Sequence, residues 1–219
     1  MKAKVFSIVI ALFMTLGVIA SANATVIHNS RAIFEGTLGA SVTDDYEDSG
    51  YVFIQSNADM TAVLGETSYT STGHNDLNIV FSSAGSQRYC AGCNGSYLLD
   101  FTSTSVGSAS GVFGAGFDVF ANVPTRDGDS YYAYVTFGDA STTNYLLSNA
   151  GSFWGITSSR LISSIHVGLI NGGTTVNGSF SHDNLTIGAA AVDAPEPVTL
   201  ALLGLGLLGI GFNRGRRQQ

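Results

Sequence analysis

The sequence predicts an all-β fold, an antiparallel β-sandwich or jelly roll, for the part of the chain between its two ends. Several stretches rich in Thr, Tyr, Phe and Val alternate apolar and polar residues, which is typical of half-buried strands. Segments rich in Gly, Ser, Asn and Asp separate these stretches and are typical of turns. No long helical period interrupts them, so we do not expect a parallel sheet with crossover helices.

Residues 1–24 predict a secretory signal peptide with an apolar helix. Two lysines precede an apolar run from Val5 to Ala20, and small residues in an A-x-A arrangement end at Ala24. A charged start, an apolar middle and a small-residue exit in this order define such a leader. We expect cleavage after Ala24, which leaves residues 25–188 as one exported β-sandwich domain.

The segment between the two ends is strongly acidic. Its cations are Arg31, Arg88, Arg126 and Arg160, against more than a dozen Asp and Glu residues. Nucleic-acid binding draws its affinity from Lys and Arg that displace counterions from phosphates, so this composition excludes it. The segment, about 170 residues, is long enough to bury a sizeable core as one domain.

One short helix is expected near the start of the domain, in the stretch SRAIFEGTLG. Ser30 is a candidate N-cap, and Phe34 and Leu38 lie four residues apart on one helical face. Gly39 can end this helix.

Three later stretches predict strands with one buried face each. The residues expected to face the core are Phe113, Ala115, Phe117 and Val119, then Tyr131, Ala133, Val135 and Phe137, then Leu161, Ser163, Ile165, Val167 and Leu169. The same alternation turns Tyr132 and Tyr134 outward, where their rings can stack on sugar rings. They are our candidate glycan-binding residues; the alternative is that they only cover the surface.

Cys90 and Cys93 predict a local disulfide. Their C-x-x-C spacing is half of a zinc ribbon, but no second cysteine pair or suitable histidine pair follows. A redox motif would need a βαβ context that the sequence does not offer. In the oxidising environment of an exported protein, a disulfide is the simplest interpretation.

The end of the chain has three parts: Pro-Glu-Pro at 195–197, an apolar run at 198–212 and a basic tail. The run is about fifteen residues long, short of the roughly twenty that cross hydrocarbon, but a thinned bilayer edge and the flanking residues bring it near spanning length. The positive-inside rule keeps the basic tail in the cytoplasm. We expect a linker at 189–194 and then a single transmembrane helix at about 198–212.

These three parts resemble the PEP-CTERM sorting signal of exopolysaccharide-producing Gram-negative bacteria. The residues that carry the resemblance are Pro195, Glu196, Pro197, the Leu/Gly run, Arg214, Arg216 and Arg217. The resemblance implies that an exosortase, a membrane-embedded cysteine transpeptidase-like enzyme, cuts near Pro-Glu-Pro and passes the protein from the inner membrane toward the cell surface or extracellular matrix. The tail would then be a temporary membrane anchor. The stretches SRAIFEGTLGASVTDDYED and SFSHDNLTIG, among others, resemble the domain that commonly accompanies this signal, whose members largely lack an assigned activity.

A further resemblance implies a structural calcium site. In jelly-roll carbohydrate-binding modules, an aromatic-Glu pair in the first strand and Asp-Asn in the last strand often meet at calcium, and here Tyr46-Glu47 and Asp183-Asn184 resemble these pairs. Calcium takes six to eight oxygens, some of which Glu47, Asp183 and nearby carbonyls can supply. The alternative is that both carboxylates are solvated strand ends.

The sequence offers little for catalysis. It contains neither G-x-S-x-G nor H-E-x-x-H. Asp44, Asp45, Glu47 and Asp48 are crowded, but alternation sends neighbours to opposite faces, so we expect a charged, solvated strand edge rather than a glycosidase pair. We therefore expect a non-enzymatic protein with no certain cofactor, structural or associated with exopolysaccharide. The alternatives are a secreted glycan-active hydrolase and a surface protein that binds another protein.

Overall fold

The computed structural model describes residues 24–121, 130–147, 152–169 and 179–191. The predicted signal peptide, apart from Ala24, and the predicted transmembrane helix and sorting motif lie outside these ranges. Within them, no helix has the length and apolar character needed to cross a membrane.

The described chain consists mainly of strands, which confirms the prediction of an all-β protein. The elements in chain order are β1 (Thr25–His28), α2 (Arg31–Glu35), β2 (Leu38–Asp44), β3 (Ile54–Gln55), α3 (Asn57–Leu64), β4 (Ser68–Ser71), β5 (Asn78–Ser83), β6 (Ser86–Cys90), β7 (Tyr97–Asp100), β8 (Val112–Ala121), β9 (Tyr131–Phe137), β10 (Thr142–Leu147), β11 (Ser152–Leu169) and β12 (Phe180–Ala190).

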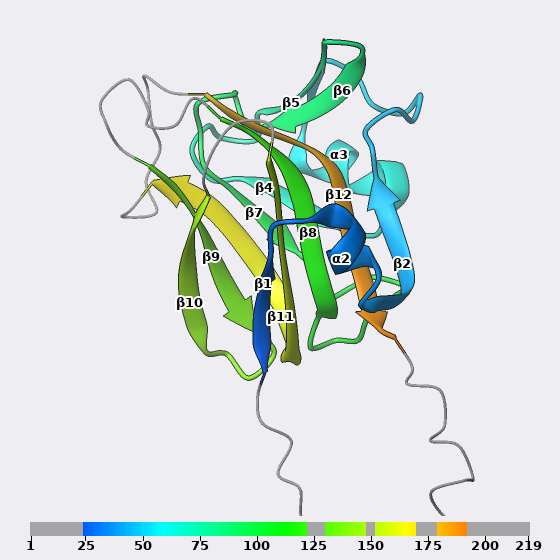
Figure 1. Cartoon of the computed structure of the whole chain (residues 1–219). Coiled ribbons are helices and arrows are strands. Elements are labelled where there is room, and N and C mark those ends of the chain that lie inside the picture. The colour runs from blue at the N-terminus through cyan, green and yellow to red at the C-terminus, as the bar shows by residue number, and fades with distance from the viewer. Residues whose placement is uncertain (1–23, 122–129, 148–151, 170–178, 192–219) are drawn as a thin grey trace, which may run out of the picture.

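All strands pair into one antiparallel sheet, with the path β10-β9-β11-β8-β12-β6-β5-β3. In addition, β1 and β7 pair with β11, β2 pairs with β12, and β4 pairs with β7. The sheet curls around its core (Figure 1), and the rings of Tyr97 on β7 and His182 on β12 meet inside it with centroids 5.4 Å apart. The finer assignment to a sandwich or jelly roll stays a prediction.

The long strand β11 causes much of this curl. Its first part pairs with β8 and β1, and its second part, from Ile162 onward, pairs with β9 and β7. Between them Leu161 adopts a left-handed backbone conformation with φ 60°, and the register with β9 then shifts between Ile162 and Ser164. Gly111 lies against this corner, where a Cβ atom would be 2.0 Å from the carbonyl oxygen of Ile162. Only glycine fits there.

The predicted core faces of β8 and β9 are confirmed, since all eight predicted residues except Phe113 are buried. Phe113 is half-buried. In β11 the prediction is right for Ile165, Val167 and Leu169 but wrong before the bulge. There Ile162 is fully buried, whereas Leu161 and Ser163 are half-buried, because the irregularity shifts the alternation by one residue.

The helices differ from the prediction in two ways. Helix α2 ends at Gly36 rather than at Gly39, and the Ser30 side chain forms no capping hydrogen bond. The sequence analysis also missed α3, although its capping residues are clear. Ser56 accepts a hydrogen bond from the backbone N–H of Asp59, and Gly65 ends the helix in the left-handed conformation.

Both ends of the described chain leave the same end of the sheet (Figure 1). Thr25 pairs with Ser158 of β11. Thr157, the residue before Ser158, pairs with Gly114 of β8. Gly114 in turn pairs with Gly188, near the end of β12. The described chain therefore ends close to the place where its first strand starts.

Candidate functional site

A row of outward-facing side chains crosses five neighbouring strands. Tyr134 on β9 pairs with Asn144 on β10 and with His166 on β11. Leu98 on β7 pairs with His166 and with Thr70 on β4. All five are partly or fully exposed, because their neighbours along β9, β11 and β7 are the residues that enter the core. The central strands thus present one face to solvent.

Three rings lie in series on this face, and we call Tyr132, Tyr134 and His166 the tyrosine strip. The ring centroids of Tyr132 and Tyr134 are 6.2 Å apart, and those of Tyr134 and His166 are 6.0 Å apart. The Tyr134 hydroxyl donates a 2.6 Å hydrogen bond to the Leu169 carbonyl oxygen, which fixes that ring. The predicted outward orientation of both tyrosines is confirmed, while their role in glycan binding stays a prediction.

The tyrosine strip is close to neutral. Burial lowers the pKa of His166, so its ring is uncharged at neutral pH. The Thr72 hydroxyl donates to Ser96 and lies 3.0 Å from His166 Nε2, so the ring donates its Nε2 proton to Thr72. Asp100 on β7 lies two residues beyond Leu98, and no Lys or Arg belongs to the described residues that pair along these rows.

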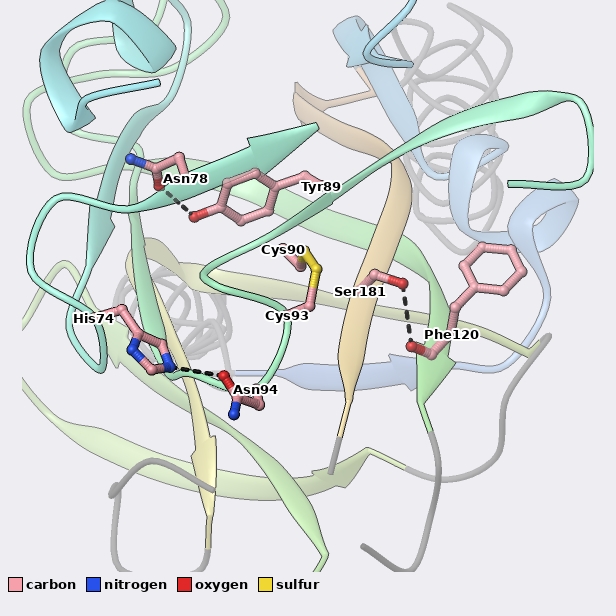
Figure 2. Close-up of a disulfide and its surroundings, with 8 residues drawn as sticks. All are labelled: His74, Asn78, Tyr89, Cys90, Cys93, Asn94, Phe120 and Ser181. Atoms are coloured by element: carbon pink, nitrogen blue, oxygen red, sulfur yellow. Dashed lines mark hydrogen bonds between the residues drawn. A yellow bond between two sulfur atoms is a disulfide. The ribbon is translucent and has the colours of Figure 1, made fainter. Parts of the chain in front are cut away.

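A disulfide loop adjoins this face, and it confirms the predicted bond between Cys90 and Cys93 (Figure 2). The loop connects β6 to β7, and the Cys93 carbonyl accepts a 3.0 Å hydrogen bond from the N–H of Phe180. The His74 ring packs against the loop, and its Nε2 atom lies 2.7 Å from Oδ1 of Asn94. The disulfide therefore holds a structural turn against β12.

The two predicted calcium ligands reach adjacent residues at the start of β6. Glu47 Oε1 accepts a 2.7 Å hydrogen bond from the N–H of Gln87, and Asp183 Oδ2 accepts a 2.6 Å hydrogen bond from the Ser86 hydroxyl. In the part of the chain that the structure describes, no three His, Cys, Asp or Glu side chains group as a metal site would need. Calcium at Glu47 and Asp183 stays a prediction.

A buried polar network, which the sequence analysis did not find, runs through the core. Its members come from strands far apart in the sequence and are Asp44, Tyr46, Tyr51, Tyr69, Tyr97 and His182, all buried. Such a network is stable only when each polar atom has a partner. Here the side chains bond to one another and join β2, β4, β7 and β12.

The hydrogen bonds of this network have one direction. The Tyr69 hydroxyl donates to Asp44 Oδ2 at 2.8 Å, so the Tyr46 hydroxyl, 3.1 Å away, donates to Tyr69. The Tyr46 oxygen then accepts from His182 Nε2 at 2.6 Å, and His182 Nδ1 accepts from the Tyr97 hydroxyl at 2.6 Å. Neutral His182 therefore carries its proton on Nε2.

Burial sets the charge states in the network. Desolvation lowers the pKa of His182 from 6.5 to about 3. Desolvation also raises the pKa of Asp44, although hydrogen bonds from Tyr51 and Tyr69 act in the opposite direction. The pKa of Tyr46 is raised well above its usual value, again mainly by burial. No member is more than 8% exposed, and their side chains join four strands of the fold.

The network corrects one sequence-based expectation. Asp44 was expected on a solvated strand edge, and this is wrong, because its side chain is only 6% exposed. Asp45, Glu47 and Asp48 are exposed, as expected. The available signal was the alternation itself, which puts Asp44 in the same inward phase as Tyr46.

Comparison with protein-family models matches residues 193–217 to the PEP-CTERM protein-sorting motif. The matched range contains the Pro-Glu-Pro residues and the three arginines singled out above, all outside the described residues. No match was found among curated proteins or among solved structures. The chain thus carries a C-terminal PEP-CTERM sorting motif, the mark of an exported protein that an exosortase processes.

Proposed function

We propose that this protein is a non-enzymatic component of the cell surface or extracellular matrix of a Gram-negative bacterium, and that it binds polysaccharide through the tyrosine strip. In this proposal the curled sheet is a jelly-roll scaffold, and the exosortase releases it from its membrane anchor. The observation that supports binding is the series of three partly exposed rings on paired strands of the sheet. Aromatic faces in such a series can stack on successive apolar faces of sugar rings.

The surroundings of the strip favour a neutral glycan. The chain has a net charge of -7, and the carboxylate of Asp100 lies on the same face. An acidic polysaccharide would meet repulsion there, without nearby cations among the described paired residues to offset it. The hydroxyl and amide groups of Thr70 and Asn144 are suited to neutral sugar hydroxyls.

Co-sedimentation of residues 25–193 with the producer's own exopolysaccharide tests this proposal. We expect retention by the wild-type protein and a loss of at least about tenfold in affinity when Tyr132 and Tyr134 are both changed to alanine, if each ring contributes on the order of 1 kcal/mol. Changing both to phenylalanine should preserve retention, because the ring faces remain. Calcium and chelator arms of the same assay test the predicted site at Glu47 and Asp183.

Phe53→Ala is the matched control, because Phe53 is 63% exposed and lies outside the tyrosine strip. Equal retention of the double alanine variant and this control would refute the role of the strip. No retention of the wild-type protein would favour the alternative of a surface component that binds another protein.

The hydrolase alternative has weaker support. Asp118 and Asp183 are paired residues on β8 and β12, but both serve the fold. Asp118 Oδ2 accepts from Asn184 at 2.9 Å and pairs with Arg31 at 3.0 Å, while Asp183 is bound by Ser86. A glycosidase needs its carboxylates free for proton transfer in a cleft. Release of reducing sugar from the same polysaccharide, lost in Asp183→Asn, would overturn the non-enzymatic proposal.

A further inference from the structure

A shallow groove of about 420 Å³ lies at the end of the sheet from which both chain ends depart. Val106 and Gly111 of the segment before β8, Phe113 of β8 and Leu161 of β11 form much of its lining. Ala189 and Ala190, the last residues of β12, complete it. The lining is mainly apolar, although the groove opens to solvent.

Two unusual backbone conformations shape this groove. Gly111 has φ 110°, and the close approach of Ile162 leaves no room for a side chain there. Leu161 has φ 60°, which bulky residues rarely adopt, and its side chain lines the groove. The sharp corner of β11 thus places a large apolar side chain next to the end of β12.

The segment that follows β12 is the natural occupant. Ala190 lines the groove, and Pro195 follows five residues later, which is at most about 17 Å of extended chain. A tether this short gives an effective concentration in the millimolar range, so weak intrinsic affinity is sufficient for occupancy.

The chemistry of that segment fits the groove. Residues 192–197 read VDAPEP, in which four of the six side chains are small and apolar. Two prolines favour an extended backbone before binding, so little conformational entropy is lost. Aromatic-lined grooves bind such proline-containing segments in other proteins, and Phe113 supplies an aromatic wall here.

We propose that residues 192–197 bind in this groove, so that the folded domain holds the Pro-Glu-Pro motif extended at the end of β12. A lipid surface is a poorer occupant, because the acidic chain is repelled by anionic headgroups. The proposal rests on the sorting motif and the groove alone, and it is independent of polysaccharide binding. As a consequence, the exosortase must draw the Pro-Glu-Pro motif out of the groove of the folded domain before it can cut.

Cysteine trapping in the chain 25–219, kept in detergent micelles, tests the contact. The native cysteines are joined in a disulfide, so Val106→Cys with Ala194→Cys introduces the two reactive thiols. We expect these thiols to form an intramolecular disulfide at least tenfold faster than the matched pair Phe53→Cys with Ala194→Cys. Similar rates for both pairs would overturn the proposal. A disulfide that forms only between two chains would also overturn it, because the occupant would then be a second copy of the chain. If anionic vesicles abolished the disulfide, the occupant would be lipid, and the proposal would be overturned as well.

Limited proteolysis gives an independent measurement without added cysteines. Elastase can cut after Val192, and occupancy of the groove should protect that bond. We expect Phe113→Ser to raise the cutting rate severalfold, whereas Phe53→Ser, the same change at an exposed position away from the groove, should leave it unchanged. Equal rates in the wild type and Phe113→Ser, with unchanged circular dichroism, would refute the docking of this segment.

Discussion

At the scale of single residues, His182 makes the stability of the domain depend on pH. The pKa of His182 is about 3 in the folded protein, whereas its ordinary value, which applies to the unfolded chain, is 6.5. Between pH 3 and 6.5 the unfolded chain therefore binds more protons than the folded protein does. The contribution of His182 is therefore complete above pH 6.5 and is lost as the pH falls toward 3. We expect the His182 contribution to the free energy of unfolding to fall by about 0.7 kcal/mol per pH unit at pH 6.5, steepening toward about 1.4 kcal/mol per pH unit near pH 5, measured by urea unfolding over that range.

His182→Gln is the matched variant for this prediction. Its amide can donate to Tyr46 and accept from Tyr97 but does not titrate, so the pH dependence should flatten. The raised pKa of Asp44 acts in the opposite sense, because folding then favours the protonated carboxyl at low pH. An unchanged slope in His182→Gln would show that another group controls acid unfolding.

The residues of the network also show where sequence reasoning reached its limit. The outward positions of Tyr132 and Tyr134 followed from alternation within one strand, which is a local property. The contact of His182 with Tyr46 joins residues 136 positions apart, and no local pattern indicates it. The sequence thus predicted which face a side chain occupies but not its partner across the core.

At the scale of elements, α3 depends on its N-terminal cap. The Ser56 hydroxyl accepts from the Asp59 N–H at 3.1 Å and donates to the Asp59 carboxylate at 2.7 Å. We expect Ser56→Ala to cost about 1 kcal/mol of unfolding free energy, a fall in Tm of roughly 2–4 °C by calorimetry. Ser103→Ala, at an exposed turn, is the control. Equal Tm values for the two variants would mean that the helix is held by its other contacts, such as the packing of Met60 and the Gly65 cap, and not by Ser56.

The elements that the sequence mispredicted share a physical cause. Helix α2 stops early because Leu38 begins β2, whose pairing with β12 satisfies the backbone better than one more helical turn. The inward set of β11 shifts because the strand bends against Gly111. In both places a distant strand decided the local structure. Where a strand lies in the middle of regular pairing, as in β9, the pattern was sufficient.

At the scale of the whole molecule, the pairing of β1 with β11 and of β12 with β8 places both ends of the described chain at one end of the sheet. Neither terminal segment carries this information, since it depends on the register of strands that are distant in sequence. If the predicted signal peptide and transmembrane helix form, this arrangement allows both to reach one membrane without crossing the domain. The tyrosine strip lies on β9 and β11, on the outer face of the sheet and not at the end where the described chain begins and finishes.

The last prediction concerns the cooperativity of the fold. Strands β3, β5 and β6 join the rest of the sheet through a single pair, His182 with Tyr89, so backbone pairing alone would let them unfold separately. The Tyr89 ring, however, packs within 5.0–5.9 Å of the rings of Tyr46, Tyr69, Tyr97 and His182. We therefore expect residues 25–191 to unfold in urea in one transition. Fluorescence of the single tryptophan, Trp154 on β11, and near-ultraviolet circular dichroism of the buried tyrosines should share one midpoint. An earlier tyrosine transition would show that backbone pairing, not ring packing, sets the boundary of the cooperative unit.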